Sequence, residues 1–220
     1  MRMRFEPRLD ILPDAQKKLW QLLEPARRLQ FVLYSGTAVA LHLGHRSSID
    51  FDFFRSQLLA KKEIEQAFAF MHDAETLQES ENTLVVAAQT SHGSVKISYF
   101  GGMGIGRVNA PLETQDSVLL VASLEDLLAT KLKAILDRAE SKDYSDIAAM
   151  LSSGVSLERA LGGFAKMYRR DPALPLKALG FFQDGDLPSL PQREQDLLRD
   201  ARDRVTAIPE MAITSGSLAG

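Results

Sequence analysis

The chain has 220 residues, of which 45% are hydrophobic and 25% charged, proportions typical of globular proteins and sufficient for one sizeable domain or a core with a smaller appendage. It contains no cysteine, which excludes disulfides, thiolate metal sites and cysteine nucleophiles. The net charge of −3 argues against a surface devoted to unspecific nucleic-acid binding.

The first third of the chain alternates between helical and strand patterns. Helical spacing of apolar residues predicts a helix over residues 14–28, and an apolar run predicts a strand over 31–34 that ends in a turn at Ser35-Gly36. Helical character returns over residues 37–43 and stops at Gly44, which predicts a glycine C-cap. Further predicted elements are a strand over 49–54, a helix over 61–72, strands over 83–89, 94–100 and 117–122, and helices over 124–138, 144–151, 157–168 and 192–205.

The change of pattern near residue 123 divides the chain into parts. We predict an α+β fold in which residues 1–122 form a core with a mixed sheet flanked by helices. Residues 123–208 form a helical C-terminal part, and residues 209–220 form a flexible tail. No window approaches the roughly 20 apolar residues of a membrane span. No apolar run follows the N-terminal charges. We therefore expect a cytoplasmic protein with no membrane partner.

The predicted strand over residues 49–54 carries two aspartates, Asp50 and Asp52, in alternation with apolar side chains. A period of two places both carboxylates on one face of the strand. Like charges at this spacing repel, and a divalent cation relieves the repulsion because Mg²⁺ prefers carboxylate oxygens. For an isolated Asp-x-Asp, two solvated aspartates on an exposed face remain the alternative interpretation.

The turn upstream of this strand supports a phosphate site. A strand, then Ser35-Gly36-Thr37, then a helix presents backbone N–H groups at a helix N-terminus, where a phosphate binds well. Glycine lets the main chain approach the ligand closely. A phosphate cradle followed by a carboxylate pair is the arrangement that metal-assisted nucleotidyl transfer requires.

These residues together resemble the first motif of the AbiEii/AbiGii-like nucleotidyltransferases, toxins within the polymerase-beta-like superfamily. Gly36-Thr37 and the Gly44-His45-Arg46 segment stand where the family has them, with twelve residues between Thr37 and Asp50. The resemblance implies a polymerase-beta-like core in which Asp50 and Asp52 bind Mg²⁺ or Mn²⁺. It implies that a nucleoside triphosphate is the substrate, that tRNA is a candidate acceptor, and that a cognate antitoxin is a partner. Ser35, Gly36, Thr37 and Arg46 would meet the phosphates.

A second segment, residues 126–147, resembles the helical motif of the same family. In this motif a lysine and an arginine precede Arg/Lys-Asp-x-x-Asp, and here Lys131, Arg138, Asp143 and Asp146 fill these positions. Lys131 and Arg138 lie two turns apart on one helix face. The resemblance gives Lys131 the role of steadying the triphosphate. It gives Asp146, or alternatively Asp143, the role of the acid that completes the site.

The sequence departs from the wider superfamily at Ser98. Related enzymes often place a third carboxylate on a later strand, and the predicted strand over 94–100 carries Ser98 in that place. Ser35 also replaces a glycine that is frequent in the family. Two alternative functions therefore stay open. One is an antibiotic-type nucleotidyltransferase that modifies a small molecule, and the other is a non-catalytic nucleotide-binding module on the same fold.

Overall fold

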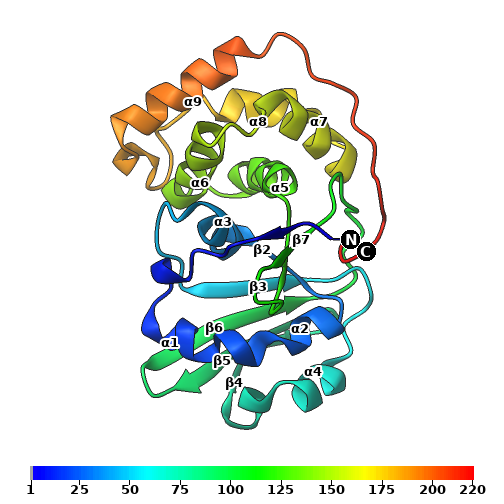
Figure 1. The fold of residues 1–220 in the computed structure, drawn as a ribbon. Coiled ribbons are helices and arrows are strands. Elements are labelled where there is room, and N and C mark those ends of the chain that lie inside the picture. Colours follow the sequence, from blue (N-terminus) through cyan, green and yellow to red (C-terminus); the bar gives the residue numbers. More distant parts are fainter. Residues whose placement is uncertain (1) are drawn as a thin grey trace. The chain divides into compact units, whose positions relative to one another are not determined.

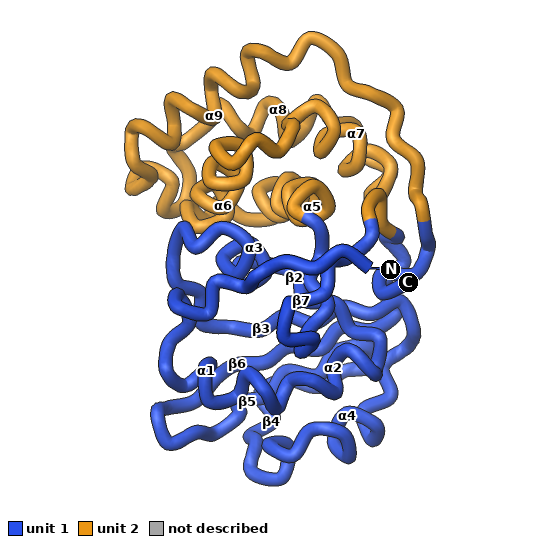
Figure 2. The backbone as a smooth tube through the Cα atoms, viewed as in Figure 1, with its two compact units in different colours: residues 1–106, 110–123, 215–220 blue, residues 107–109, 124–214 orange. Residues whose placement is uncertain are grey.

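The computed structural model describes residues 2–220 and divides them into two compact units (Figure 2). Unit 1 comprises the chain up to Gly106 together with Ala110–Ser123 and Ser215–Gly220. Unit 2 comprises Arg107–Asn109 and Leu124–Thr214. The chain therefore enters unit 2 twice and ends in unit 1.

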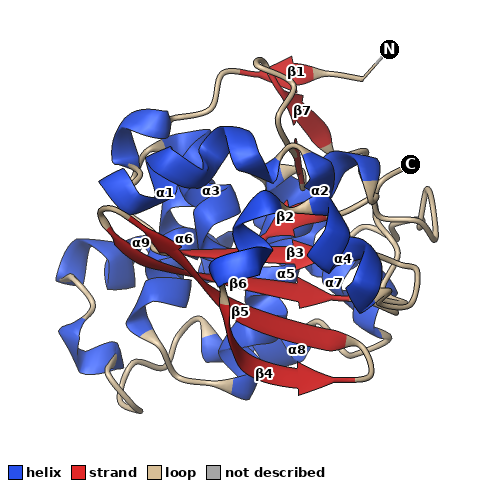
Figure 3. Cartoon of the chain, turned by 90° about the horizontal axis from the view of Figure 1, so that it is seen from below, coloured by secondary structure: helices blue, strands red, loops and turns tan. Residues whose placement is uncertain are grey.

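Unit 1 is built around one mixed eight-stranded sheet (Figure 3). The strands are β1 (Arg4–Phe5), β2 (Val32–Tyr34), β3 (Asp50–Phe54), β4 (Glu75–Ser80), β5 (Thr83–Thr90), β6 (Gly93–Phe100), β7 (Leu112–Thr114) and β8 (Leu120–Val121). Their order is β1-β7-β8-β2-β3-β6-β5-β4. The central strand β3 pairs antiparallel with β2 and parallel with β6. The two faces of β3 are therefore continued across its neighbours.

The alternation predicted for β3 is confirmed. Phe51 and Phe53 are fully buried, whereas Asp50 and Asp52 are partly exposed on the other face. The Phe53 ring stacks on that of Phe51 and on that of Tyr99 on β6, the latter at a centroid distance of 5.6 Å. Burial of large aromatic surfaces supplies much of the hydrophobic stabilisation of such a core. The aromatic face thus fixes which way the two carboxylates point.

Helices cover both faces of this sheet. They are α1 (Asp14–Leu19), α2 (Pro25–Arg28), α3 (Ser35–Leu43) and α4 (Lys61–Ala67), with 3₁₀ turns η1 (Leu9–Ile11), η2 (Trp20–Leu23) and η3 (Ala69–Asp73). In Figure 1, α3 lies on one side of the sheet, and α1 and α4 lie on the other. Gly44 ends α3 in the left-handed conformation with φ 65°, as predicted for its C-cap.

Two predicted helices are interrupted in the structure. The helix predicted over residues 14–28 is divided into α1, η2 and α2, and α2 begins at Pro25. Proline has no N–H to continue the helical hydrogen bonds, so a regular helix cannot run through this residue. The helix predicted over 61–72 is divided at Phe68, which is extended and places its ring 5.4 Å from that of Tyr99.

The strands missing from the sequence prediction are β1, β4 and β7, and β8 is shorter than the strand predicted over 117–122. All six residues of β4 are exposed, and its sequence is mostly polar. A bulge between Thr76 and Gln78 interrupts its pairing with β5. An exposed edge strand of this kind lacks the apolar alternation from which strands are recognised.

Unit 2 is helical. It contains α5 (Leu124–Asp137), α6 (Ser141–Ser152), α7 (Leu157–Tyr168), α8 (Ala173–Ala178), the 3₁₀ turn η4 (Leu187–Ser189) and α9 (Gln192–Arg204). The central helix α5 packs against α6, α7 and α8. The predicted fold class, a mixed sheet flanked by helices with a helical C-terminal part, is confirmed. Over residues 2–220, no helix combines the length and the apolar character that a membrane crossing demands.

The last residues differ from the predicted flexible tail over 209–220. Thr214 donates its backbone N–H to Arg107 O within unit 2. In unit 1, Leu218 is 1% exposed and its N–H donates to Ser56 Oγ at 3.0 Å. Arg2 donates to Ala219 O at 2.7 Å. The apolar Leu-Ala pair inside a Gly/Ser-rich stretch supplies the buried surface that anchors this segment.

Candidate active site

The carboxylates of Asp50 and Asp52 lie side by side with two residues of β6. The parallel register places Asp50 opposite Lys96 and Asp52 opposite Ser98. Lys96 Nζ lies 3.0 Å from Asp50 Oδ2, and the two side chains are 46% and 34% exposed. Ser98 is 3% exposed. The face therefore presents a carboxylate–ammonium pair beside a carboxylate–hydroxyl pair.

The first turn of α3 begins directly after β2, which pairs with β3 through Tyr34 and Asp52. No side chain of the preceding residue caps this helix, and the N–H groups of a first helical turn have no acceptor within the helix. Ser35 has φ 66°, in the left-handed region that favours glycine. The chain thus turns sharply into α3 at the predicted phosphate cradle, and Gly36 and Thr37 follow in its first turn.

Thr37 connects this turn to the carboxylate strand. Its side chain is buried, and Oγ1 donates to the backbone carbonyl of Asp50. Thr37 Oγ1 also lies 2.8 Å from Ser48 Oγ. Because the hydroxyl is engaged inside the protein, a phosphate role of Thr37 falls to its backbone N–H. The side chain instead fixes where α3 begins relative to β3.

Arg46 lies between α3 and β3, in the loop that leads to Asp50. Its side chain is half-buried, and Nη1 donates to Ser47 O at 3.0 Å. A guanidinium group presents its donors in a geometry that suits a phosphate. The contact of Arg46 with a phosphate stays a prediction.

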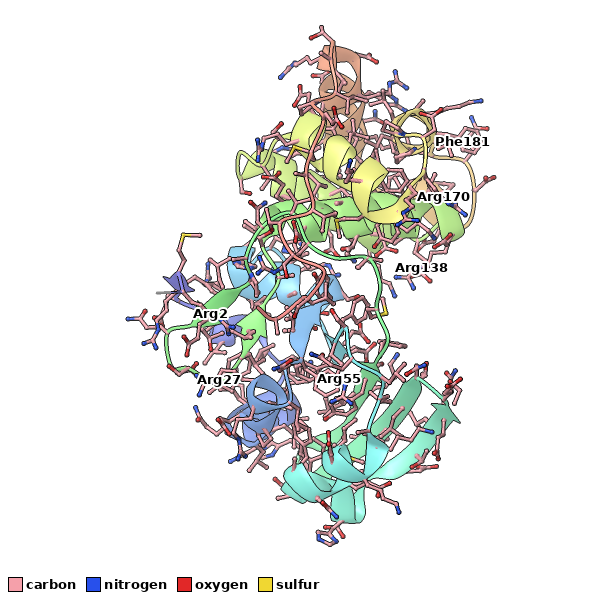
Figure 4. All side chains as sticks on the ribbon, turned by 90° about the vertical axis from the view of Figure 1, so that its right-hand side faces the viewer. Arg2, Arg27, Arg55, Arg138, Arg170 and Phe181 are labelled. Atoms are coloured by element: carbon pink, nitrogen blue, oxygen red, sulfur yellow. The ribbon has the colours of Figure 1, made fainter. Side chains whose placement is uncertain are left out.

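In unit 2, the second predicted group of residues forms one buried ion cluster. Lys131 Nζ on α5 lies 2.6 Å from Asp143 Oδ1 and 2.6 Å from Asp146 Oδ2, both on α6. Arg138, which is labelled in Figure 4, donates from Nε to Asp143 Oδ2 at 2.8 Å. The two aspartate side chains are 0% exposed and that of Lys131 is 5% exposed. Lys131 therefore forms ion pairs with both carboxylates, and Arg138 supplies the second positive charge that balances them.

The positive charges of this cluster affect the pKa of Asp143. Burial alone raises this pKa because it disfavours the ionised form. The opposing effects of the Lys131 charge and the hydrogen bond from Arg138 are larger together, so the pKa of Asp143 lies below its ordinary value of 3.8. Asp143 is thus an ionised carboxylate in the interior of unit 2.

The two carboxylates on this face of unit 1 are the donor type that a divalent cation would need, with its further ligands supplied by water and phosphate. Among residues 2–220, no group of three or more histidine, cysteine or acidic side chains is arranged to hold a metal ion. Asp50 and Asp52 would supply two carboxylates, and Mg²⁺ usually completes such a shell with water and substrate phosphates. Ser98 cannot bridge cations as a carboxylate does. The lysine ammonium beside Asp50 is the cation that the protein itself provides.

Sequence reasoning did not single out Lys96 or Ser48. Alternation within residues 95–98 places Lys96 on the same face as Ser98, which is the one available signal. The pairing of Lys96 with Asp50 depends on the register between two strands far apart in sequence. That register cannot be read from local patterns.

Comparisons with known proteins identify a family and one relative in sequence. The family model described as the nucleotidyl transferase AbiEii toxin of type IV toxin–antitoxin systems matches residues 18–210. An uncharacterised protein of Aquifex aeolicus (strain VF5) is 28% identical over 158 residues, which cover 70% of this chain and 74% of that protein.

Two solved structures share the fold. MenT4, a nucleotidyltransferase toxin from Mycobacterium tuberculosis H37Rv, superposes with a TM-score of 0.59 at 13% identity, over 87% of this chain and 84% of its own. A protein from H. pylori described as a nucleotidyltransferase superposes with a TM-score of 0.56 at 16% identity, over 85% of this chain and 91% of its own. At these identities the structures establish the fold alone. The family model, in contrast, matches most of the chain, and this chain belongs to the AbiEii family of nucleotidyltransferase toxins.

Proposed function

We propose that this protein transfers a nucleoside monophosphate from a nucleoside triphosphate to tRNA in a reaction that depends on Mg²⁺ or Mn²⁺. The observation that carries the proposal is the adjacency of two elements in unit 1. The Asp50/Asp52 pair lies on one face of β3, and the Thr37 hydroxyl binds the start of α3 to the backbone of Asp50. This adjacency supports the proposal, because helix N-termini bind phosphates and paired carboxylates bind divalent cations.

Each residue of unit 1 has a defined part in this proposal. Asp50 and Asp52 hold the divalent cation, the backbone of Ser35-Gly36-Thr37 receives phosphate oxygens, and Arg46 donates to them. When bound, the cation neutralises charge on the triphosphate and on the departing pyrophosphate. The fixed geometry of α3 and β3 orients the α-phosphate for attack.

The proposed reaction is a substitution at the α-phosphorus of the triphosphate. An acceptor hydroxyl oxygen forms the new bond to this phosphorus, and the bond to the bridging α,β oxygen breaks. Pyrophosphate leaves with the electron pair, and the acceptor hydroxyl gives its proton to solvent water. The products are a nucleotidylated acceptor and pyrophosphate.

Lys131 and Asp146 keep the roles that the family resemblance gives them as predictions. Their ion pair in unit 2 gives each residue a second role in folding. The two roles are separable by experiment. Loss of triphosphate affinity in a folded Lys131→Arg variant supports the first role, whereas loss of folding in Lys131→Met supports the second.

The test supplies each α-labelled nucleoside triphosphate with total tRNA and Mg²⁺ or Mn²⁺, and follows both label transfer and pyrophosphate release. Asp50→Asn and Asp52→Asn should each lower transfer by at least about a hundredfold, since each removes a negatively charged metal ligand. Asp73→Asn is the matched control, because Asp73 is an exposed aspartate of unit 1 outside this site.

Transfer that is lost in both site variants and kept in the control supports the proposal and identifies the nucleotide. Transfer to a small cationic antibiotic in place of tRNA would contradict the acceptor class. Transfer that persists in both Asp50→Asn and Asp52→Asn would contradict the site.

One observation favours a second candidate function. Ser98 lies directly opposite Asp52, at a place where a third carboxylate is common in the wider superfamily. A non-catalytic module on this fold would bind a triphosphate without releasing pyrophosphate. Measured triphosphate binding together with no transfer from all four nucleotides would select this candidate.

The toxin family also leads us to propose a cognate antitoxin as the partner. Co-expression with the antitoxin gene should restore the growth that expression of the toxin alone suppresses. The Asp50→Asn variant should suppress growth less than the wild-type protein does. Equal suppression by both proteins would separate toxicity from the proposed site.

A further inference from the structure

We propose that Lys96 is an internal competitor for the metal site, because it holds Asp50 in an ion pair that a divalent cation must break before both aspartates can bind it. The inference rests on the proposed function, since it concerns the same carboxylate pair. It predicts weak cation binding by the protein alone and tighter binding when a triphosphate arrives with the cation.

The sheet register places Lys96 at the site. β3 and β6 are parallel neighbours, and their pairing sets Asp50 opposite Lys96 and Asp52 opposite Ser98. The residues on either side of Lys96, Val95 and Ile97, are buried in the aromatic core, so alternation turns Lys96 to the carboxylate face.

The ion pair between Lys96 and Asp50 is formed in the structure, but Lys96 can be displaced from it. Lys96 Nζ lies 3.0 Å from Asp50 Oδ2, with the side chains 46% and 34% exposed. Pairs with this exposure are weakly stabilising because water solvates both partners well. In unit 2, by contrast, the side chain of Lys131 is 5% exposed and binds two aspartates that are 0% exposed. Lys96 is thus a lysine that can leave its partner at low cost.

Electrostatics make this lysine a competitor. A divalent cation at Asp50 lies within a few ångströms of the ammonium group, and their repulsion opposes binding unless Lys96 moves away. A triphosphate changes this balance because its oxygens offer the displaced ammonium another anionic partner. Its oxygens also complete the shell of the cation. Cation and triphosphate should therefore each increase the affinity of the other.

The experiment measures the affinity for Mn²⁺ alone, by electron paramagnetic resonance of free Mn²⁺ during titration of the full chain. Lys96→Met should bind Mn²⁺ about three- to tenfold more tightly than wild type without nucleotide, since it removes a cation from the site. The difference should shrink with a non-hydrolysable α,β-methylene triphosphate and with rising ionic strength. Lys96→Arg, which keeps the charge, should bind as weakly as wild type.

Lys62→Met is the matched control, because Lys62 is an exposed lysine on α4, which lies on the other side of the sheet from α3 (Figure 1). It should leave Mn²⁺ affinity unchanged. Thermal unfolding of each variant verifies that the sheet is intact. Unchanged or weaker Mn²⁺ binding in a folded Lys96→Met protein would overturn the inference.

The design separates this inference from the proposed function. If wild type binds Mn²⁺ and Asp50→Asn does not, while Lys96→Met matches wild type, only the role of Lys96 fails. If neither wild type nor Lys96→Met binds Mn²⁺, even with the triphosphate analogue, the proposed metal site fails and the inference fails with it.

Discussion

Unit 1 and unit 2 each contain a pair of aspartates served by a lysine, and the two pairs differ in burial. Asp50 on β3 meets Lys96 at a partly exposed face. Asp143 and Asp146 on α6 share Lys131 in the interior, where both distances are 2.6 Å. In unit 1 the carboxylate can therefore exchange its lysine for another cation, whereas in unit 2 the lysine is a buried part of the fold.

Burial decides this difference because water competes with every ion pair that it can reach. An exposed carboxylate that loses its lysine is resolvated, so little is lost. A buried carboxylate that loses its lysine remains uncompensated in a poor solvent for charge. The same two residue types, aspartate and lysine, can therefore serve ligand exchange in one unit and stability in the other.

The largest effect on stability is expected for Lys131→Met. We expect this variant to lose about 3–5 kcal/mol of the free energy of unfolding, because two buried carboxylates lose their shared cation. Urea unfolding and hydrogen exchange of α5 and α6 would measure the loss. Lys142→Met is the control, because this lysine is 58% exposed and should change stability by less than about 0.5 kcal/mol. A loss below about 1 kcal/mol in Lys131→Met would contradict a stabilising cluster.

Lowering the pH should destabilise unit 1 before it destabilises unit 2. Burial lowers the pKa of His42 in unit 1 from 6.5 to about 4, while its Nε2–H donates to Ala122 O at 3.0 Å. The folded protein therefore takes up this proton later than the unfolded chain does. The contribution of His42 to the stability of unit 1 is present above pH 6.5 and is lost as the pH falls toward about 4, on the order of 3 kcal/mol in total.

The pKa of Asp143 also lies below its ordinary value of 3.8, so its contribution to unit 2 is lost only at still lower pH. Hydrogen exchange at pH 7, 5 and 3.5 should show α3 losing protection before α6. His42→Gln should flatten the pH dependence of unit 1 between 6.5 and 4. An unchanged slope in His42→Gln would assign the effect to other groups.

Thr37→Val severs the connection between α3 and the exposed pair. Valine has nearly the shape of threonine, so the main change is the lost hydrogen bond from Oγ1 to Asp50 O in a buried position. We expect a loss of about 1–2 kcal/mol, measured by urea unfolding. Thr76→Val on the exposed strand β4 is the control. Equal stability of Thr37→Val and wild type would show that the Thr37 hydroxyl does not hold α3 against β3.

Ser35→Gly should stabilise unit 1 by about 0.5–1 kcal/mol. At φ 66° a residue with a side chain is strained, and glycine relieves the strain but loses more entropy on folding. Ser35→Ala keeps the strain and should gain nothing. Thermal unfolding compares the two variants, and an equal melting temperature for both would show that the backbone at residue 35 is not strained.

Asp50→Asn and Asp52→Asn should have the smallest effect on stability, within about 0.5 kcal/mol, since both side chains are partly exposed. Asp50→Asn loses the ion pair with Lys96 but also relieves repulsion between the two aspartates. Urea unfolding would measure both variants. A loss above about 1 kcal/mol would give this pair a structural role like that of the buried one.

Much of the fold follows from local rules in the sequence. Alternation over residues 49–54 gave the two faces of β3, and glycine at position 44 predicted the left-handed end of α3. The exposed strand β4 carries no such alternation, so its existence depends on pairing with β5. A strand can therefore be recognised from the sequence where one of its faces is buried, and it is missed where neither face is buried.

Some residues of the candidate site could likewise be predicted from the sequence, and others could not. The sequence identified Asp50, Asp52 and the turn at Ser35, because these residues are close together along the chain. The pairing of Asp50 with Lys96 required the register of β3 against β6. The burial of Lys131 required the packing of α5 against α6, and helix periodicity alone does not distinguish an exposed lysine from one enclosed by two carboxylates.

The return of residues 215–220 to unit 1 makes unit 2 an insertion within the sequence of unit 1. While unit 1 stays folded, an unfolded unit 2 is a loop with both ends held, and such a loop has less conformational freedom than a free tail. Burial of Leu218 in unit 1 thereby stabilises the helices of unit 2, although Leu218 is linked to them only by the continuous chain. Removing six residues at the end of the sequence would turn this loop into a tail and raise the entropy that unit 2 gains on unfolding.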